Sequence, residues 1–177
     1  MSPAESPDRP PVVLPSGAVL RAAIPADVPE LLRLVVELAT FEKEPDSVLA
    51  CVADYEAILF PGHGAPTGHA EVAQLDGRLV GMAFWYVTFS TWSGHNGIWL
   101  EDLYVEPGHR GLGVGTAMLR RLAGICAARG YHRLEWWVLD WNEPAIRFYR
   151  GLGARALDGW THYRIDGDAL AQTGGPS

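Results

Sequence analysis

Apolar residues that recur every three or four positions predict four helices in this chain. The clearest starts at Asp27, a candidate N-cap, and runs to about Phe41, with one apolar face made of Val28, Leu31, Leu32, Val35 and Leu38. A second helix is expected around residues 47–59, before a proline-glycine breaker. A third starts near Val114 and stops at Gly130, and a short fourth follows Asn142, which can act as its cap.

Apolar runs rich in β-branched and aromatic residues predict six strands, at residues 18–22, 69–75, 78–89, 98–105, 134–139 and 155–165. The pair Asp76-Gly77 separates the second and third and is a strong hairpin signal. Residues 1–16, with several prolines, and residues 171–177 are expected to be mobile tails. The remaining residues, 17–170, are expected to form a single α/β domain. A chain of this length can bury a sizeable core.

Composition narrows the class of protein. The 177 residues carry a net charge of −7, which argues against a nucleic-acid partner and weakly suits a cationic one. Two cysteines form no disulfide framework, and the six histidines show no ligand spacing, so we expect no metal and a reducing cytoplasm. The longest apolar run, residues 79–89, is too short to cross a bilayer, and no targeting segment is expected.

A glycine-rich run stands between an expected strand and the third helix. Such a position favours an anion site, because the first turn of a helix has unpaired N–H groups and glycine lets the backbone approach a ligand closely. Arg110 can add a charged contact, and His109 beside the run could take part in catalysis. The spacing fits neither the nucleotide-triphosphate loop nor the dinucleotide fingerprint, and a glycine turn without a ligand is the alternative.

Two carboxylates, Glu101 and Asp102, are embedded in an apolar strand. Strand alternation predicts one on each face, so one would point to the interior or a cleft, where an unpaired carboxylate is costly. The alternative is a strand end at which both reach solvent. Tyr149 shares its helix face with Ala145 and Leu152 and is either a core tyrosine or a proton donor to a leaving thiolate.

The order of these features resembles the GNAT superfamily of N-acetyltransferases. Its cofactor loop has the form [RQ]-x-x-G-x-[GA], here Arg110, Gly113 and Gly115, followed by Trp141-Asn142-Glu143-Pro144 and Phe148-Tyr149. Within it, residues 100–105 and 141–149 look like the spermidine/spermine (diamine) N-acetyltransferase branch, and the resemblance covers residues 19–165. It implies a GNAT-like mixed, mostly antiparallel sheet with helices on both faces and a splayed strand pair that binds acetyl-CoA.

The resemblance also implies roles for individual residues. Tyr149 matches the general acid toward the CoA thiolate, and Glu101 matches the group that accepts the ammonium proton, through water. The residues that would bind acetyl-CoA are Leu103, Tyr104, Val105, Arg110, Gly111, Leu112, Gly113, Val114, Gly115, Thr116, Asn142, Glu143, Pro144 and Ala145. Those that would line the acceptor channel are Phe41, Glu42, Glu101, Asp102, Glu135, Trp136, Trp137 and Asp158.

The acceptor is therefore expected to be a small cationic amine, and the enzyme a cytoplasmic homodimer. Phe41 stands where polyamine enzymes can have tyrosine, and the segment around Asp158 is shorter, so diamines, polyamines and thialysine-like amines all stay open. Two alternatives keep the fold: acetylation of a protein N-terminus or of a xenobiotic or aminoglycoside amine, and a non-catalytic acyl-CoA sensor.

Overall fold

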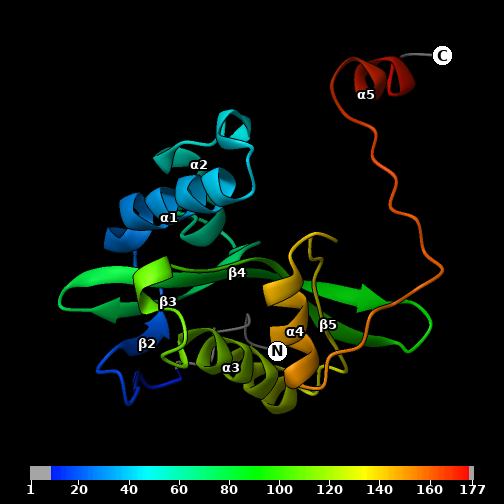
Figure 1. Ribbon diagram of the computed structural model, residues 1–177. Coiled ribbons are helices and arrows are strands. Elements are labelled where there is room, and N and C mark those ends of the chain that lie inside the picture. The colour runs from blue at the N-terminus through cyan, green and yellow to red at the C-terminus, as the bar shows by residue number, and fades with distance from the viewer. Residues whose placement is uncertain (1–8, 176–177) are drawn as a thin grey trace. The chain divides into compact units, whose positions relative to one another are not determined.

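A six-stranded mixed sheet organises the first part of the chain. The computed structural model describes residues 9–175, and the strands lie in sequence order, β1-β2-β3-β4-β5-β6 (Figure 1). All neighbours are antiparallel except β5 and β6, which are parallel. The strands are β1 (Val12–Val13), β2 (Val19–Ala22), β3 (His69–Leu75), β4 (Arg78–Ser90), β5 (His95–Val105) and β6 (Leu134–Glu135). The mixed, mostly antiparallel sheet expected from the sequence is confirmed.

The described residues contain five α-helices: α1 (Val28–Phe41), α2 (Val52–Leu59), α3 (Val114–Arg129), α4 (Glu143–Gly151) and α5 (Gly167–Thr173). The helix expected from residue 47 starts instead at Val52, after a separate single turn, η2 (Pro45–Ser47). The start is set by Asp54, whose carboxylate accepts the N–H of Cys51 at 2.8 Å and so caps the helix there. The α3 helix ends, as expected, at Gly130 with φ +65°.

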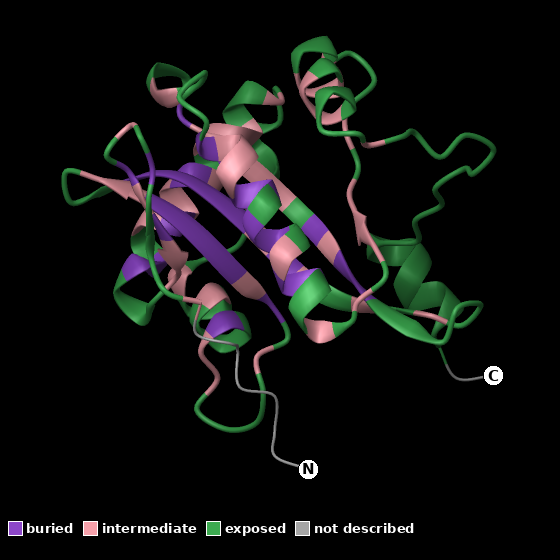
Figure 2. Cartoon of the chain, turned by 90° about the horizontal axis from the view of Figure 1, so that it is seen from below, coloured by how far each residue is buried: buried purple, intermediate pink, exposed green. Residues whose placement is uncertain are grey.

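Helices cover both faces of the sheet. On one face Met82 of β4 packs in a cluster with Leu31 and Leu34 of α1 and Leu59 of α2. Its neighbour Gly81 faces the other way, where an added Cβ would lie 3.4 Å from Met118 of α3. Figure 2 shows the buried residues gathered on the central strands and on one side of α3. This packing of helices on both faces fixes the end of β5, from which the chain continues toward α3.

The N-terminal segment is more ordered than the sequence suggested. Within the residues expected to form a mobile tail, β1 pairs with β2, and Leu14 is buried. The guanidinium of Arg121 on α3 donates to the carbonyls of Arg9 and Pro10, while its Nε binds Glu71 of β3 at 2.5 Å. These contacts come from residues far apart in the sequence, which explains why local composition did not reveal them.

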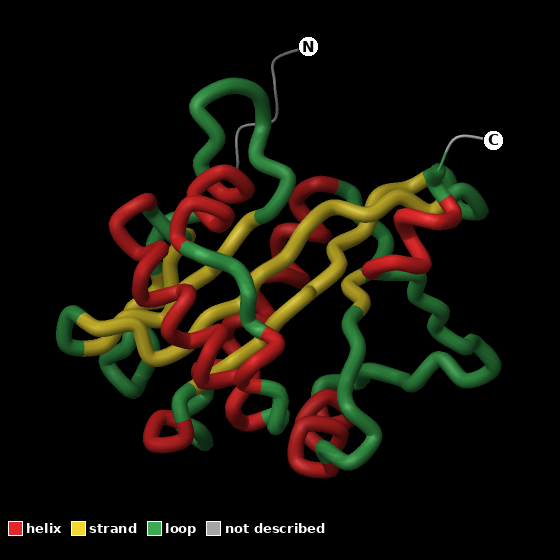
Figure 3. The backbone as a smooth tube through the Cα atoms, turned by 90° about the horizontal axis from the view of Figure 1, so that it is seen from above, coloured by secondary structure: helices red, strands yellow, loops and turns green. Residues whose placement is uncertain are grey.

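The strand expected at residues 134–139 is short. Only Leu134 and Glu135 pair with β5, opposite Ile98 and Trp99. Beyond Trp99, no described residue pairs with the open edge of β5. The splayed strand pair expected from the sequence corresponds to this early end of pairing (Figure 3).

The chain divides into two compact units, residues up to Trp137 and residues from Val138 onward. The second unit contains α4 and α5. The strand predicted at residues 155–165 is wrong: the segment has no regular structure, and α5 follows where the sequence suggested the start of a loose tail. Residues 155–175 are exposed throughout, so the apolar pattern of 155–165 finds no strand edge with which to form hydrogen bonds. No helix in residues 9–175 is long and apolar enough to cross a membrane.

Candidate functional site

The glycine loop, residues 110–116, connects the end of β5 to α3. Glu106 and a single turn, η3 (Pro107–His109), lead into the loop, and its first and second glycines, Gly111 and Gly113, have φ of +77° and +82°. Gly113 is the N-cap of α3, in a left-handed conformation that side chains rarely adopt. Glycine is therefore required by the backbone here, as the sequence suggested.

The first turn of α3 leaves backbone donors available for a ligand. Ala117 is the first residue whose N–H binds a backbone carbonyl, that of Gly113 at 2.9 Å. Within residues 9–175, no acceptor is found for the N–H groups of Val114, Gly115 and Thr116, and Gly113 has no side chain to cap them. Unpaired N–H groups at the positive end of a helix suit a phosphate. The loop thus has the backbone donors that a phosphate group needs.

Arg110 is held at the base of the loop. Its Nε donates to the carbonyl of Val105 at 2.8 Å, and its guanidinium lies 5.1 Å from the ring centre of Phe41 and 5.6 Å from that of Tyr104. Both ring contacts are within the range of a cation–π interaction. Arg110, expected to contact the cofactor, therefore also joins the loop to the end of α1, where Phe41 was expected to meet the acceptor.

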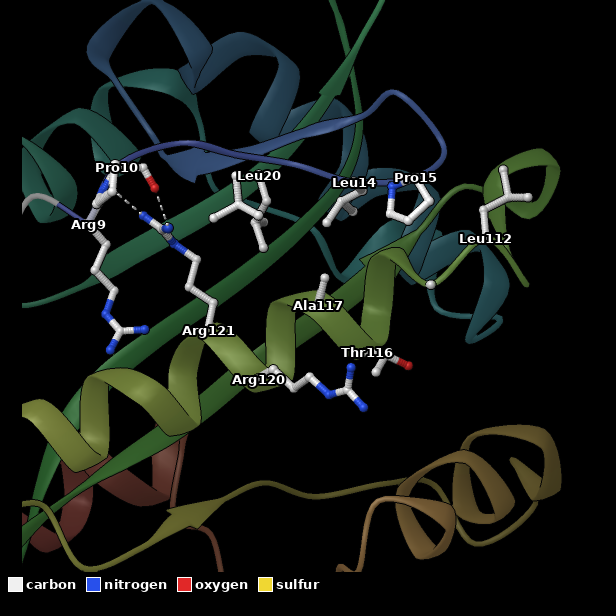
Figure 4. A pocket seen from close by; sticks show the side chains of 12 residues that line it. Arg9, Pro10, Leu14, Pro15, Leu20, Leu112, Thr116, Ala117, Arg120 and Arg121 are labelled. Carbon is white, nitrogen blue, oxygen red and sulfur yellow. Dashed lines mark hydrogen bonds between the residues drawn. The ribbon is translucent and has the colours of Figure 1, made fainter.

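A cavity of about 660 Å³ lies along the flank of α3, between it and the N-terminal segment. Leu112, Gly113 and Thr116 of the glycine loop form part of its wall, and Arg120 lies one helical turn beyond Thr116 (Figure 4). Arg121 also lines it, but its guanidinium is bound by Glu71 and by the two backbone carbonyls. The loop accordingly borders an open space on this side of the helix.

A β-bulge in β5 places both embedded carboxylates on one face. Phe84 of β4 pairs with Asp102, and the next residue, Trp85, pairs with Leu100. Glu101 therefore has no opposite residue on β4. An extra residue of this kind reverses the alternation on its strand. The expectation that Glu101 and Asp102 point to opposite faces is therefore wrong, and Asp102 shares with Phe84 the face that α1 and α2 cover.

The acidic cluster, Glu42, Glu101 and Asp102, is an unfavourable place for negative charge. Burial, the charge of Glu101 and the charge of Glu42 raise the pKa of Asp102 to about 6. Burial also raises the pKa of Glu42. The end of α1 and the strand β5 thus bring three carboxylates together. Such a group attracts a cation, and binding of the cation would relieve the repulsion between the carboxylates.

Aromatic residues surround these carboxylates. The indole Nε1 of Trp99 donates to Glu101 Oε2 at 2.9 Å. Burial and then the charge of Asp102 raise the pKa of Tyr55 in α2 to about 12, and burial and the neighbouring Glu101 raise the pKa of Tyr86. Sequence analysis missed these three aromatics. Trp99 could have been found, since it stands two residues before Glu101 in the same strand, but the bulge that gathers the group leaves no mark in the sequence.

Of the expected acceptor residues Glu135, Trp136 and Trp137, at the end of β6 and directly after it, one lies beside this cluster. The ring of Trp137 stands edge-on to that of Trp99, with centroids 4.7 Å apart. Glu135 forms an ion pair with Arg133 at 2.8 Å, and Trp136 is half-buried. Trp137 therefore joins the aromatic surroundings of Glu101, whereas Glu135 has its own counter-ion.

The strand segment expected to pair with a pantetheine arm has a free edge. Leu103, Tyr104 and Val105 pair with β4 on one side, and no strand among the described residues pairs with them on the other. The Tyr104 side chain is buried against α1, where its hydroxyl donates to Glu37 at 3.3 Å. The Tyr104 side chain is thus engaged by α1, and binding of a pantetheine arm by the backbone of these residues stays a prediction.

The second unit carries the remaining expected residues. Asn142 caps α4 by accepting the N–H of Ala145 at 3.3 Å, and Glu143 and Pro144 form the first turn. Tyr149 is half-buried on α4, with its ring centre 5.2 Å from that of Phe148. Asp158 is exposed in the segment after the helix. The capping function of Asn142 is confirmed, whereas its cofactor contact stays a prediction.

The chain is similar in sequence to known acetyltransferases. Residues 31–154 match the model of the acetyltransferase (GNAT) family. The chain is 34% identical to a thialysine N-epsilon-acetyltransferase of Sus scrofa, over 90% of this chain and 99% of the relative. It is also 34% identical to the human spermidine/spermine N(1)-acetyltransferase-like protein 1, over 85% of this chain and 23% of that longer protein.

A solved structure supports the fold alone. An integron cassette protein from the mobile metagenome of V. cholerae superposes with a TM-score of 0.73, covering 88% of this chain and 96% of that one, at 22% identity.

Proposed function

Since this chain belongs to the acetyltransferase (GNAT) family, we propose that it transfers the acetyl group of acetyl-CoA to a primary amine of a small cationic acceptor. The observation that carries the proposal is the course of β5. The strand holds Glu101 and Asp102 at its bulge, and residues 106–113 connect it to the free N–H groups at the start of α3. One continuous segment therefore offers groups for a cation and groups for a pyrophosphate.

The carboxylates prepare the amine for attack. An alkyl ammonium is protonated near neutral pH and cannot attack a thioester until it loses a proton. We assign the role of proton acceptor to Glu101, acting through water, because it is exposed and its carboxylate is oriented by the hydrogen bond from Trp99. Asp102 and Glu42 supply further negative charge that attracts the ammonium. The neutral amine then attacks the carbonyl carbon of the thioester and forms a C–N bond, and the C–S bond breaks when the tetrahedral intermediate collapses.

The leaving thiolate needs a proton, and we assign its transfer to the hydroxyl of Tyr149. A phenol has a pKa near that of a thiol, so the exchange is close to balanced in free energy. Unpaired N–H groups on the free edge of β5 would stabilise the oxyanion of the tetrahedral intermediate. No enzyme nucleophile takes part, so neither Cys51 nor Cys126 is required.

The acceptor class follows from the acidic cluster and the relatives. Three carboxylates with aromatic neighbours suit an amine that carries a second positive charge, and cations also bind aromatic faces. The names of the relatives mention thialysine and spermidine/spermine. We therefore place thialysine-like amines and diamines or polyamines ahead of protein N-termini and aminoglycosides. We further propose that the enzyme is a cytoplasmic homodimer.

The test is a thiol-release assay with acetyl-CoA and a panel of amines: thialysine, lysine, putrescine, spermidine, spermine and an aminoglycoside. We expect turnover with the first five amines and the lowest turnover with the aminoglycoside. Turnover on the aminoglycoside alone would overturn the acceptor class and leave the acetyltransferase. Binding of acetyl-CoA without thiol release from any of them would instead favour a sensor.

A further inference from the structure

The entry of the glycine loop rests on one buried carboxylate that belongs to no predicted site. Glu106, directly after β5, is 7% exposed. Its Oε1 accepts a hydrogen bond from Arg33 of α1 at 2.8 Å and lies 2.9 Å from Nη2 of Arg78 at the start of β4. Its Oε2 lies 3.3 Å from Nδ1 of His109 in η3. One side chain thus joins a helix, a strand and the turn that leads into the loop.

Backbone contacts fix the same point. The N–H of Glu106 donates to the carbonyl of Val80 at 3.0 Å, and its own carbonyl accepts the N–H of His109 at 2.9 Å. Arg33 also donates to the carbonyl of Leu79 at 2.8 Å. The turn before the loop is therefore tied to β4 and α1 through both main chain and side chains.

The α1 helix reaches the loop a second time at its other end. Arg33 is in its second turn and bonds to Glu30 and Glu37 as well as Glu106. The last residue of α1, Phe41, lies under the guanidinium of Arg110. The helix that ends at the acceptor side of the site thus contacts Glu106, which precedes the loop, and Arg110, the first residue of the loop.

Stability alone is a poor explanation for this arrangement. Burying an ion-pair network costs desolvation energy that largely offsets the attraction, so apolar residues could hold the layers together as well. Charged hydrogen bonds do, however, fix direction and distance more narrowly than apolar contacts. The loop needs such accuracy, because its N–H groups must converge on a pyrophosphate.

We propose that Glu106 is a positioning residue for the cofactor: by binding Arg33 and Arg78 through its side chain and the N–H of His109 through its carbonyl, it holds the glycine loop in the geometry that accepts acetyl-CoA. The inference rests on the proposed function, in which the loop binds that cofactor. Glu106 itself touches no substrate, so its loss should weaken cofactor binding and leave the chemical step intact.

The test compares Glu106→Gln with Asp27→Asn, a matched control. Asp27 is also 7% exposed and also accepts hydrogen bonds from an arginine, Arg21, but it lies in the turn before α1 and does not contact the loop. Both changes remove a buried charge and should lower the melting temperature. Only Glu106→Gln should raise the Kd and KM of acetyl-CoA, roughly tenfold or about 1.4 kcal/mol, with kcat at saturating acetyl-CoA changed less than about twofold.

Titration calorimetry with acetyl-CoA separates the outcomes. If the unmodified protein does not bind acetyl-CoA, the proposed function fails. If it binds and Glu106→Gln binds equally well, or if Asp27→Asn weakens binding to the same extent, the positioning role is refuted. Should Glu106→Gln not fold, Arg78→Gln replaces it, because the Arg78 side chain is 59% exposed and its removal leaves the core intact. A rise of about threefold in KM for acetyl-CoA is then expected, and an unchanged KM overturns the proposal.

Discussion

At the scale of single residues, the bulge at Glu101 has the largest consequence. One unpaired residue turns two carboxylates toward the same face, and Glu42 at the end of α1 adds its charge to theirs. The sequence revealed the residue types and their place in a strand. It could not reveal the bulge, which depends on how β4 and β5 pair, and so the faces were assigned wrongly.

The raised pKa of Asp102 predicts a pH dependence of stability. The folded value of about 6 lies above the ordinary value of 3.8, so between these pH values the folded chain holds more protons than the unfolded chain. The free energy of unfolding therefore falls as pH rises through this window, and the loss persists above it. Asp102→Asn should remove the contribution, about 2 kcal/mol after allowance for partial exposure.

Urea denaturation at about pH 4 and about pH 8 measures this effect. The difference in unfolding free energy between the two pH values should shrink in Asp102→Asn relative to the unmodified protein. An equal difference in both proteins would show that the environment of Asp102 is not as desolvated as the geometry indicates.

Tyr149→Phe tests the proposed general acid. Loss of the hydroxyl should lower kcat by about 100-fold, because the thiolate must leave without a proton, and should leave the Kd of acetyl-CoA nearly unchanged. Tyr163→Phe is the control, since Tyr163 is 86% exposed in the same unit and has no proposed role. Steady-state kinetics with both variants decides the matter, and equal kcat values for the two would exclude Tyr149 from the mechanism.

At the scale of elements, the strand-loop-helix segment from β5 to α3 was the most predictable part. Helical periodicity after Val114, the stop at Gly130 and the glycine run are local signals, and each is found where expected. Residues 155–165 show the limit of such signals. Their apolar pattern indicated a strand, but a strand needs a neighbour, and the structure provides none for this exposed segment.

The backbone at Gly113 allows a matched test of the loop. Gly113 and Gly77, in the β3–β4 turn, both have φ +82°, and an added Cβ would meet nothing within 4 Å at either. Alanine should therefore destabilise the fold by about 1 kcal/mol at each position. Only Gly113→Ala should also weaken acetyl-CoA binding, since it alters the start of α3.

Thermal unfolding and calorimetry on the two glycine variants provide the measurements. Equal loss of stability with a selective loss of cofactor affinity in Gly113→Ala is the expected pattern. Unchanged affinity in Gly113→Ala would mean that the loop conformation does not determine cofactor binding.

At the scale of the whole molecule, the two units divide the proposed machinery. The first contains the glycine loop and the acidic cluster, and the second contains Tyr149 and the cap Asn142. Sequence similarity to the thialysine N-epsilon-acetyltransferase of Sus scrofa extends over 90% of the chain, so it includes most of both. The similarity to an acetyltransferase therefore extends into both units.

The proposed homodimer is a property of the whole chain. Light scattering after size exclusion should give a mass of about twice the 19.3 kDa of one chain at micromolar concentration. A mass of 19.3 kDa throughout the concentration range would contradict the dimer and leave the transferase activity untouched.

The most direct test of the central claim is the mass of the amine after reaction. The protein is incubated with acetyl-CoA and thialysine or spermidine, and the amine is examined by mass spectrometry beside a sample without protein. The account predicts an amine heavier by one acetyl group, formed only with the protein and at a rate that Tyr149→Phe reduces strongly. Amines that keep their mass, with acetyl-CoA bound but unconsumed, would contradict it.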